Sequence, residues 1–148
     1  MPQPRPASSA IVTRGDRMLL VRRKNPPSAD MFAFPGGKAE PGERPEDAAL
    51  RELLEETGIE ARNPQLFATY DLKPETASGA ASSHYFLSVF LVEADHTAEA
   101  VANDDAADPG WYTVEEVRDL PVPPSVLECC ERVAKQLHSL QNRGMKPQ

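Results

Sequence analysis

One segment near the middle of the chain, Gly37–Ile59 (GKAEPGERPEDAALRELLEETGI), constrains the fold more than any other. Pro45 predicts the first position of a helix, because the missing proline N–H costs little there. Gly58 predicts the end of that helix, because glycine readily adopts the left-handed conformation found just beyond a helix C-terminus. The segment therefore predicts a helix over 45–57, preceded by a glycine-containing loop.

The predicted helix carries three glutamates on one face. Glu52, Glu55 and Glu56 are spaced i, i+3 and i+4, which places them within an arc of about 100° on the helical wheel. The opposite side, which we expect to pack on a sheet, carries Leu50, Leu53 and Leu54. Like charges four residues apart destabilise a helix by a few tenths of a kcal/mol, so the cluster indicates a cation between the carboxylates. Carboxylate oxygens with open coordination positions suit Mg²⁺ or Mn²⁺.

The residues around this cluster fit a longer pattern. A bare ExxEE on a helix is more often a solvated acidic face than a metal site. Here Gly-x5-Glu-x7-Arg-Glu-Leu-x-Glu-Glu-x-Gly-Ile is satisfied at every fixed position from Gly37 to Ile59. The segment resembles the Nudix box, and the chain resembles a Nudix hydrolase. The resemblance implies an α/β/α sandwich that hydrolyses a nucleoside diphosphate linked to another group, with one or more Mg²⁺ or Mn²⁺ ions as cofactor.

The resemblance also assigns roles to residues in and beside the box. The implied metal ligands are the side chains of Glu52, Glu55 and Glu56 and the carbonyl oxygen of Gly36. The three glutamates are implied as catalytic residues for the same reason. Arg51 and Glu43 are implied as a structural salt bridge that keeps the loop and the helix in register.

The catalytic base is left open between two places in the sequence. In many members of the family it lies on a loop before the last strand, where this chain has Asp104 and Asp105 ahead of Trp111. We take Asp105 as the candidate catalytic residue on this loop. In other members a glutamate of the box is the base, and a plain solvated loop is the competing interpretation of the two aspartates.

Basic residues on either side of the glycine pair are candidate phosphate contacts. Arg22 and Arg23 end a strand predicted over 17–23, and Lys38 follows Gly37. Arginine and lysine are common ligands of phosphate groups. Because side chains alternate along a strand, Arg22 and Arg23 cannot both face one cleft. An exposed basic cluster with no ligand is the alternative.

The group beyond the diphosphate is predicted less directly. Phe32 or Phe34, and either Tyr85 or Phe86, could stack on a base, although core packing is the commoner role of such rings. Of the first two, we take Phe34 as the candidate. The stretch 121–125 lacks the Asn with which antimutator-like family members read an oxidised purine. ADP-ribose, or a related dinucleotide or nucleotide sugar, is therefore the leading substrate prediction. The alternatives are a nucleoside triphosphate pyrophosphatase that removes oxidised nucleotides and a non-catalytic, nucleotide-binding regulator.

The remaining pattern predicts one α+β domain over 1–148, with disordered ends at about 1–7 and 142–148. The predicted strands are Ser9–Thr13, Arg17–Arg23, Phe32–Phe34, Gln65–Lys73, His84–Glu93 and Trp111-Tyr112. Besides the helix over 45–57, helices are predicted over Val114–Leu120 and Val126–Leu140, with Ser125 as a cap of the latter. Such a mixture indicates a mixed β-sheet flanked by helices, as in an α/β/α sandwich.

Composition argues against several classes of partner. A net charge of −7 disfavours a nucleic-acid polymer, whose phosphates are bound by basic faces. A small phosphorylated substrate stays compatible with it, because a bound metal reverses the local charge. No apolar stretch is long enough to span a membrane, and the first residues lack a secretory signal, so we expect a cytoplasmic protein. Cys129 and Cys130 are adjacent and predict neither a disulfide nor a metal site. A homodimer is left open.

Overall fold

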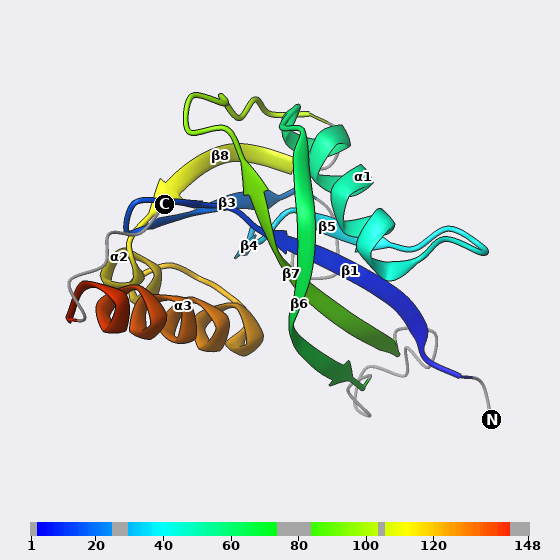
Figure 1. Cartoon of the computed structure of the whole chain (residues 1–148). Helices are drawn as coiled ribbons and strands as arrows, with labels where there is room; N and C mark the ends of the chain where they lie inside the picture. Colours follow the sequence, from blue (N-terminus) through cyan, green and yellow to red (C-terminus); the bar gives the residue numbers. More distant parts are fainter. Residues whose placement is uncertain (1–2, 25–29, 74–83, 104–105, 143–148) are drawn as a thin grey trace.

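The computed structural model describes residues 3–24, 30–73, 84–103 and 106–142. In chain order its elements are β1 (Arg5–Ile11), β2 (Thr13–Arg14), β3 (Arg17–Arg23), β4 (Phe32–Ala33), β5 (Gly36–Lys38), α1 (Pro45–Thr57), β6 (Ala61–Leu72), β7 (Tyr85–Ala94), β8 (Ala106–Tyr112), α2 (Val114–Arg118) and α3 (Pro124–Asn142). The strands lie between α1 on one side and α2 with α3 on the other (Figure 1). The predicted α+β sandwich is therefore confirmed.

The strands form two sheets. The first has the order β5-β1-β7-β6, and its central pair β1 and β7 is parallel while both outer pairings are antiparallel. The second contains β2, β3 and β4, with β8 paired to β3. The first sheet is thus mixed, as predicted. Its short edge strand β5 brings the glycine pair to β1, where Gly36 and Gly37 lie opposite Ser9 and Ser8.

Two apolar clusters hold the layers together. Under α1, the buried side chains of Leu53 and Ala49 pack with residues of β1 and β7, among them Ala10 and Phe90. On the opposite side, α2 and α3 cover a second cluster built from Ile11, Met18, Leu20, Phe34, Val89, Val114, Val117, Val126, Cys129, Cys130 and Val133. Both cysteines are buried and unoxidised in this core. The first of these clusters fixes α1 against the first sheet, next to β5.

Several predicted boundaries are wrong, each because long-range pairing overrides the local signal. β1 begins at Arg5, where it pairs with Tyr85 of β7, so residues 5–7 belong to the sheet and not to a disordered end. β5 was not predicted, because its glycines indicate a loop. β8 begins at Ala106, five residues before the predicted Trp111, where it pairs with Arg23 of β3.

The buried face of α1 also differs from the predicted one. Leu54 is 47% exposed, whereas Glu56 is only 8% exposed. The last turn of α1 lies against β5, so its buried sector includes a carboxyl group in place of a leucine. The last helix begins at Pro124, so Ser125 stands inside its first turn and not at its cap.

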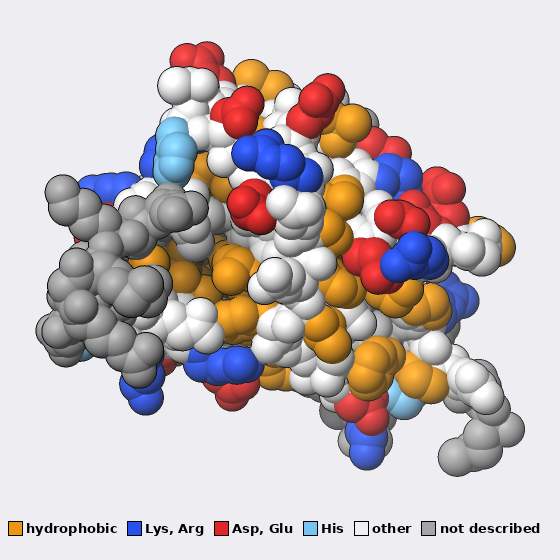
Figure 2. All heavy atoms as spheres, viewed as in Figure 1, with side chains coloured by type: hydrophobic (Ala, Val, Ile, Leu, Met, Phe, Trp, Pro, Cys, Tyr) orange, Lys and Arg blue, Asp and Glu red, His pale blue; other side chains and the backbone are white. Residues whose placement is uncertain are grey.

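The described surface carries both signs of charge. In the view of Figure 2, acidic and basic side chains are interspersed over the upper and right parts of the face, the side on which α1 lies in Figure 1. No helix among the described segments has both the length and the apolar character needed to cross a membrane.

Candidate metal and substrate site

The helix that supplies the carboxylates begins and ends where its sequence predicts. Pro45 occupies the first turn of α1, followed by Glu46 and Asp47. Acidic side chains are stabilising at this end, because it is the positive end of the helix dipole. Gly58 ends the helix with φ 78°, and its N–H donates to the carbonyl of Leu54. The two ends of α1 are thereby defined, and Glu52 and Glu56 point toward β5.

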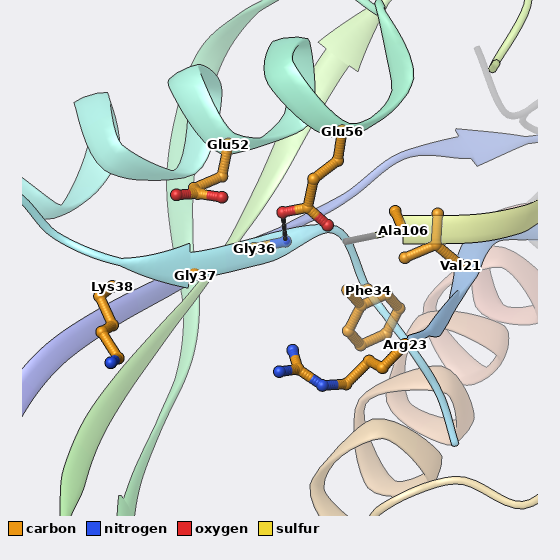
Figure 3. A pocket seen from close by; sticks show the side chains of 9 residues that line it. All are labelled: Val21, Arg23, Phe34, Gly36, Gly37, Lys38, Glu52, Glu56 and Ala106. Carbon is orange, nitrogen blue, oxygen red and sulfur yellow. Dashed lines mark hydrogen bonds between the residues drawn. The ribbon is translucent and has the colours of Figure 1, made fainter. Parts of the chain in front are cut away.

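A pocket of about 200 Å³ is lined by residues of α1, the glycine strand β5, the end of β3 and the start of β8. Its lining residues are Val21, Arg23, Phe34, Gly36, Gly37, Lys38, Glu52, Glu56 and Ala106. Figure 3 shows Glu52 and Glu56 reaching from α1 toward the backbone at Gly36 and Gly37. Arg23 and Lys38 extend from the other side of that backbone. Two carboxylates therefore share the pocket with two cations.

Glu56 is held by the strand it faces. The backbone N–H of Gly36 donates to its carboxylate Oε2 at 3.1 Å. Burial, followed by the neighbouring Glu52 carboxyl, raises the pKa of Glu56 to about 9. A carboxyl group buried beside a second one binds a proton tightly in the absence of a cation. A divalent ion between the two would favour the ionised form instead.

Glu52 occupies space that only glycine leaves open. A Cβ atom added to Gly37 would lie 2.7 Å from the Glu52 carboxyl carbon, well inside van der Waals contact. At Gly36 an added Cβ would lie 2.7 Å from the Cβ of Ser9. Both glycines are therefore needed for the close approach of backbone to backbone and of carboxylate to backbone.

Arg51 ties the loop before α1 to the helix. It donates to both carboxylate oxygens of Glu43, at 2.8 and 3.0 Å, and to the carbonyl of Lys38 at 3.2 Å. Its Nη1 also donates to Glu52 at 2.9 Å and to Glu55 at 3.1 Å. The Arg51 hydrogen bonds lower the pKa of Glu43 to about 2, and Glu43 in turn raises that of Arg51. The predicted structural salt bridge is confirmed.

Glu55 does not join the other two glutamates. Its side chain is 47% exposed and points to Arg51, and it does not line the pocket. Within the described residues, no three side chains of the metal-binding types converge on one point. Of the predicted metal ligands, Glu52, Glu56 and Gly36 line the pocket. Their all-oxygen chemistry fits Mg²⁺ or Mn²⁺ rather than zinc.

The two arginines of β3 point in different directions. Arg23 lines the pocket. Arg22 instead donates to Asp108 and to Asp30, both at 2.7 Å. The prediction that only one of the pair faces the cleft is confirmed. Arg22, predicted as a substrate contact, is not brought to the pocket, because two carboxylates hold its guanidinium elsewhere.

Of the other predicted site residues, some line the pocket and some lie outside the described residues. Lys38 lines the pocket, and so does Phe34, although that ring is only 6% exposed and belongs to the core. Asp104 and Asp105 lie outside the described residues. The next residue, Ala106, lines the pocket and was not predicted, as alanine carries no chemical signal. Val21 was missed too, although its spacing of two from Arg23 on a strand could have indicated it.

Comparisons with known proteins agree with this geometry. A family model described as the NUDIX domain matches residues 3–129. The ADP-ribose pyrophosphatase of Methanocaldococcus jannaschii is 32% identical over 117 residues, which cover 79% of this chain and 66% of the archaeal protein. A putative 8-oxo-dGTP diphosphatase 3 of Mycobacterium tuberculosis is 27% identical over 130 residues, 88% of this chain and 57% of that protein. The chain thus spans less than two thirds of the length of these two relatives.

A solved structure matches over nearly its full length. The crystal structure of a MutT NUDIX hydrolase from Burkholderia pseudomallei superposes with a TM-score of 0.77 at 27% identity. The match covers 89% of this chain and 99% of that one. The fold, the family model and the residues of the box therefore all indicate the same family.

Proposed function

Because the chain belongs to the Nudix family of hydrolases, we propose that it cleaves the diphosphate of ADP-ribose, or of a related dinucleotide or nucleotide sugar, with the help of a divalent metal ion. One observation carries the proposal: Glu52 and Glu56 of α1 share a pocket with Arg23 and Lys38. Carboxylates suit a metal ion and cations suit phosphate oxygens, so the pocket offers both halves of a metal diphosphate complex.

Glu52 and Glu56 would hold the metal, with the backbone of Gly36 beside them. We propose Glu55 as a further ligand once it leaves Arg51. When bound, Mg²⁺ or Mn²⁺ neutralises phosphate charge, stabilises the leaving group and lowers the pKa of an attacking water.

The remaining residues of the site act on the substrate. Arg23 and Lys38 would bind and orient the diphosphate from the side opposite the glutamates. Phe34 and Val21 would exclude water from that end of the pocket. The hydrolytic water would give its proton to a carboxylate, and we propose Asp105 for this role because the residue after it lines the pocket.

The assignment of the base has a matched test. Asp105→Asn should lower kcat by about 100-fold or more and remove the acidic limb of the pH–rate profile, whereas Asp104→Asn should retain both. Equal activity of the two variants would move the role to a glutamate of the box.

The choice of ADP-ribose rests on the archaeal relative, a named ADP-ribose pyrophosphatase with the higher of the two identities given. The mycobacterial relative supports a second candidate, an oxidised nucleoside triphosphate. Both candidate substrates would place their phosphates in the same pocket. They differ in the groups attached to those phosphates, which extend outside it.

A substrate panel tests the proposal. Purified protein with Mg²⁺ is incubated with ADP-ribose, NADH, diadenosine polyphosphates, nucleotide sugars and oxidised dGTP, and released nucleoside monophosphate or pyrophosphate is measured. We expect AMP and ribose 5-phosphate from ADP-ribose. Preferred release of pyrophosphate from oxidised dGTP would favour the second candidate. Tight binding without turnover of any compound would identify a non-catalytic regulator.

A further inference from the structure

The pocket is too small for the whole of the proposed substrate. Its volume is about 200 Å³, whereas sites that enclose a drug-sized ligand occupy roughly 300–1,000 Å³. A nucleoside diphosphate derivative must therefore extend beyond it. Figure 3 shows Val21, Phe34 and Ala106 at one end of the glycine strand and Lys38 at the other. Arg23 lies beside Phe34 at the first end, and Lys38 is the polar residue at the second end.

An aromatic ring lies next to Lys38. The Nζ atom of Lys38 lies over the ring of Tyr85, 5.9 Å from its centroid. Strand register explains the contact, because Lys38 pairs with Ala7 of β1, and Ala7 pairs with Leu87, two residues from Tyr85 on the same face of β7. The small side chain of Ala7 leaves room for the lysine to cross β1. The Tyr85 ring thus contacts a residue that lines the pocket.

The neighbouring aromatic residue faces the other way. Phe86 pairs with Pro6, one register position from the pairing of Tyr85 with Arg5, so the two rings project from opposite faces of the sheet. Phe86 is 43% exposed, on the face that does not carry Lys38. Of the two rings, Tyr85 is the one on the face of Lys38, which lines the pocket, and Phe86 provides a matched control.

We propose that Tyr85 is the platform on which the nucleobase of the substrate stacks, and that Lys38 leaves the ring and binds the diphosphate. The inference rests on the proposed function, since it extends the same site outward. Lys38 currently covers the ring. A stacked base makes a stronger contact with an aromatic side chain than an exposed ammonium does. The base therefore takes the ring, and the flexible lysine moves to the phosphate oxygens. Because every base has a π-face, the ring provides affinity without selecting one base.

The test compares the two halves of ADP-ribose. AMP carries the base and ribose 5-phosphate does not, and calorimetric titration measures the Kd of each for the folded protein. In Tyr85→Ala we expect the Kd of AMP to rise about 10-fold, while that of ribose 5-phosphate stays unchanged. Tyr85→Phe keeps the ring and should bind AMP as the wild type does, and so should Phe86→Ala. Lys38→Met should weaken both ligands, because it removes a phosphate contact.

Three results would overturn the platform. These are an unchanged Kd for AMP in Tyr85→Ala, an equal loss for both ligands, or a wild-type protein that binds AMP no better than ribose 5-phosphate. Failure of the proposed function is distinguishable, because it would appear as absence of Mg²⁺-dependent turnover while the dependence of AMP binding on Tyr85 persists.

Discussion

Glu56 combines burial with a close carboxyl neighbour, and the chemistry of the site depends on that combination. Its carboxylate accepts from the N–H of Gly36 and faces the same pocket as Glu52. Without a cation, this environment favours the protonated acid. With a divalent cation, both carboxylates can ionise and act as ligands. The residue should therefore report metal binding through protein stability as well as through activity.

A pH dependence of the metal-free protein follows from the Glu56 pKa. That pKa is raised from 4.5 to about 9, so between these values the folded protein keeps a proton that the unfolded chain releases. The free energy of unfolding should therefore fall as pH rises through this window, by at most about 1.4 kcal/mol per pH unit. Thermal unfolding in a chelator checks this.

Glu56→Gln should flatten that pH dependence, because the amide does not titrate. Addition of Mg²⁺ at about pH 8 should raise the Tm of the wild type and leave that of the variant nearly unchanged. Parallel pH profiles for the two proteins would show that Glu56 is not the titrating group.

Gly37→Ala should disable the site while leaving the fold. The added Cβ would meet the Glu52 carboxyl at 2.7 Å and push it from its place. A displacement of this size should lower kcat by about 10- to 100-fold. Gly15→Asn is the control, since no atom lies within 4 Å of a Cβ there and asparagine tolerates a positive φ. Steady-state kinetics should separate them, and a fully active Gly37→Ala would refute the packing argument.

At the scale of elements, α1 and the loop before it are joined by Arg51. Its five hydrogen bonds to described residues reach Glu43, Glu52, Glu55 and the carbonyl of Lys38. The same side chain therefore orients a pocket carboxylate and the strand that carries a pocket lysine. Positioning of the metal site and stability of the loop are coupled through it.

Replacing Arg51 by Met should destabilise the protein by roughly 1–3 kcal/mol, because Glu43 and Glu52 lose a charged partner in a partly buried setting. The matched control is Arg44→Met, whose exposed ion pair with Glu46 should contribute less to stability than the contacts of Arg51. Urea unfolding measures both. Equal midpoints for the two variants would contradict the role of Arg51.

Elements with two local end signals could be predicted from sequence, and elements formed by distant pairing could not. α1 runs from Pro45 to Thr57, as its proline and glycine indicate. β5 contains two glycines and forms only because β1 lies beside it. The i, i+3, i+4 spacing identified the glutamates but not their different surroundings, since Arg51 draws Glu55 outward while β5 buries Glu56.

At the scale of the whole molecule, the pocket is assembled from β3, β5, α1 and the start of β8. These segments are separated by long stretches of chain, and the two sheets and α1 bring them together. Sequence supplied the chemistry of the box. It did not show that Arg23, and not Arg22, lines the pocket, because that depends on Asp30 and Asp108 binding Arg22.

The most direct test of metal-dependent diphosphate cleavage at this pocket is the rate of AMP release from ADP-ribose, measured against Mg²⁺ concentration for the wild type and Glu56→Gln. We expect turnover by the wild type that requires Mg²⁺, and a kcat at least about 100-fold lower in the variant, with an unchanged circular dichroism spectrum. Near-normal turnover by Glu56→Gln, or wild-type turnover that persists in a chelator, would contradict this expectation.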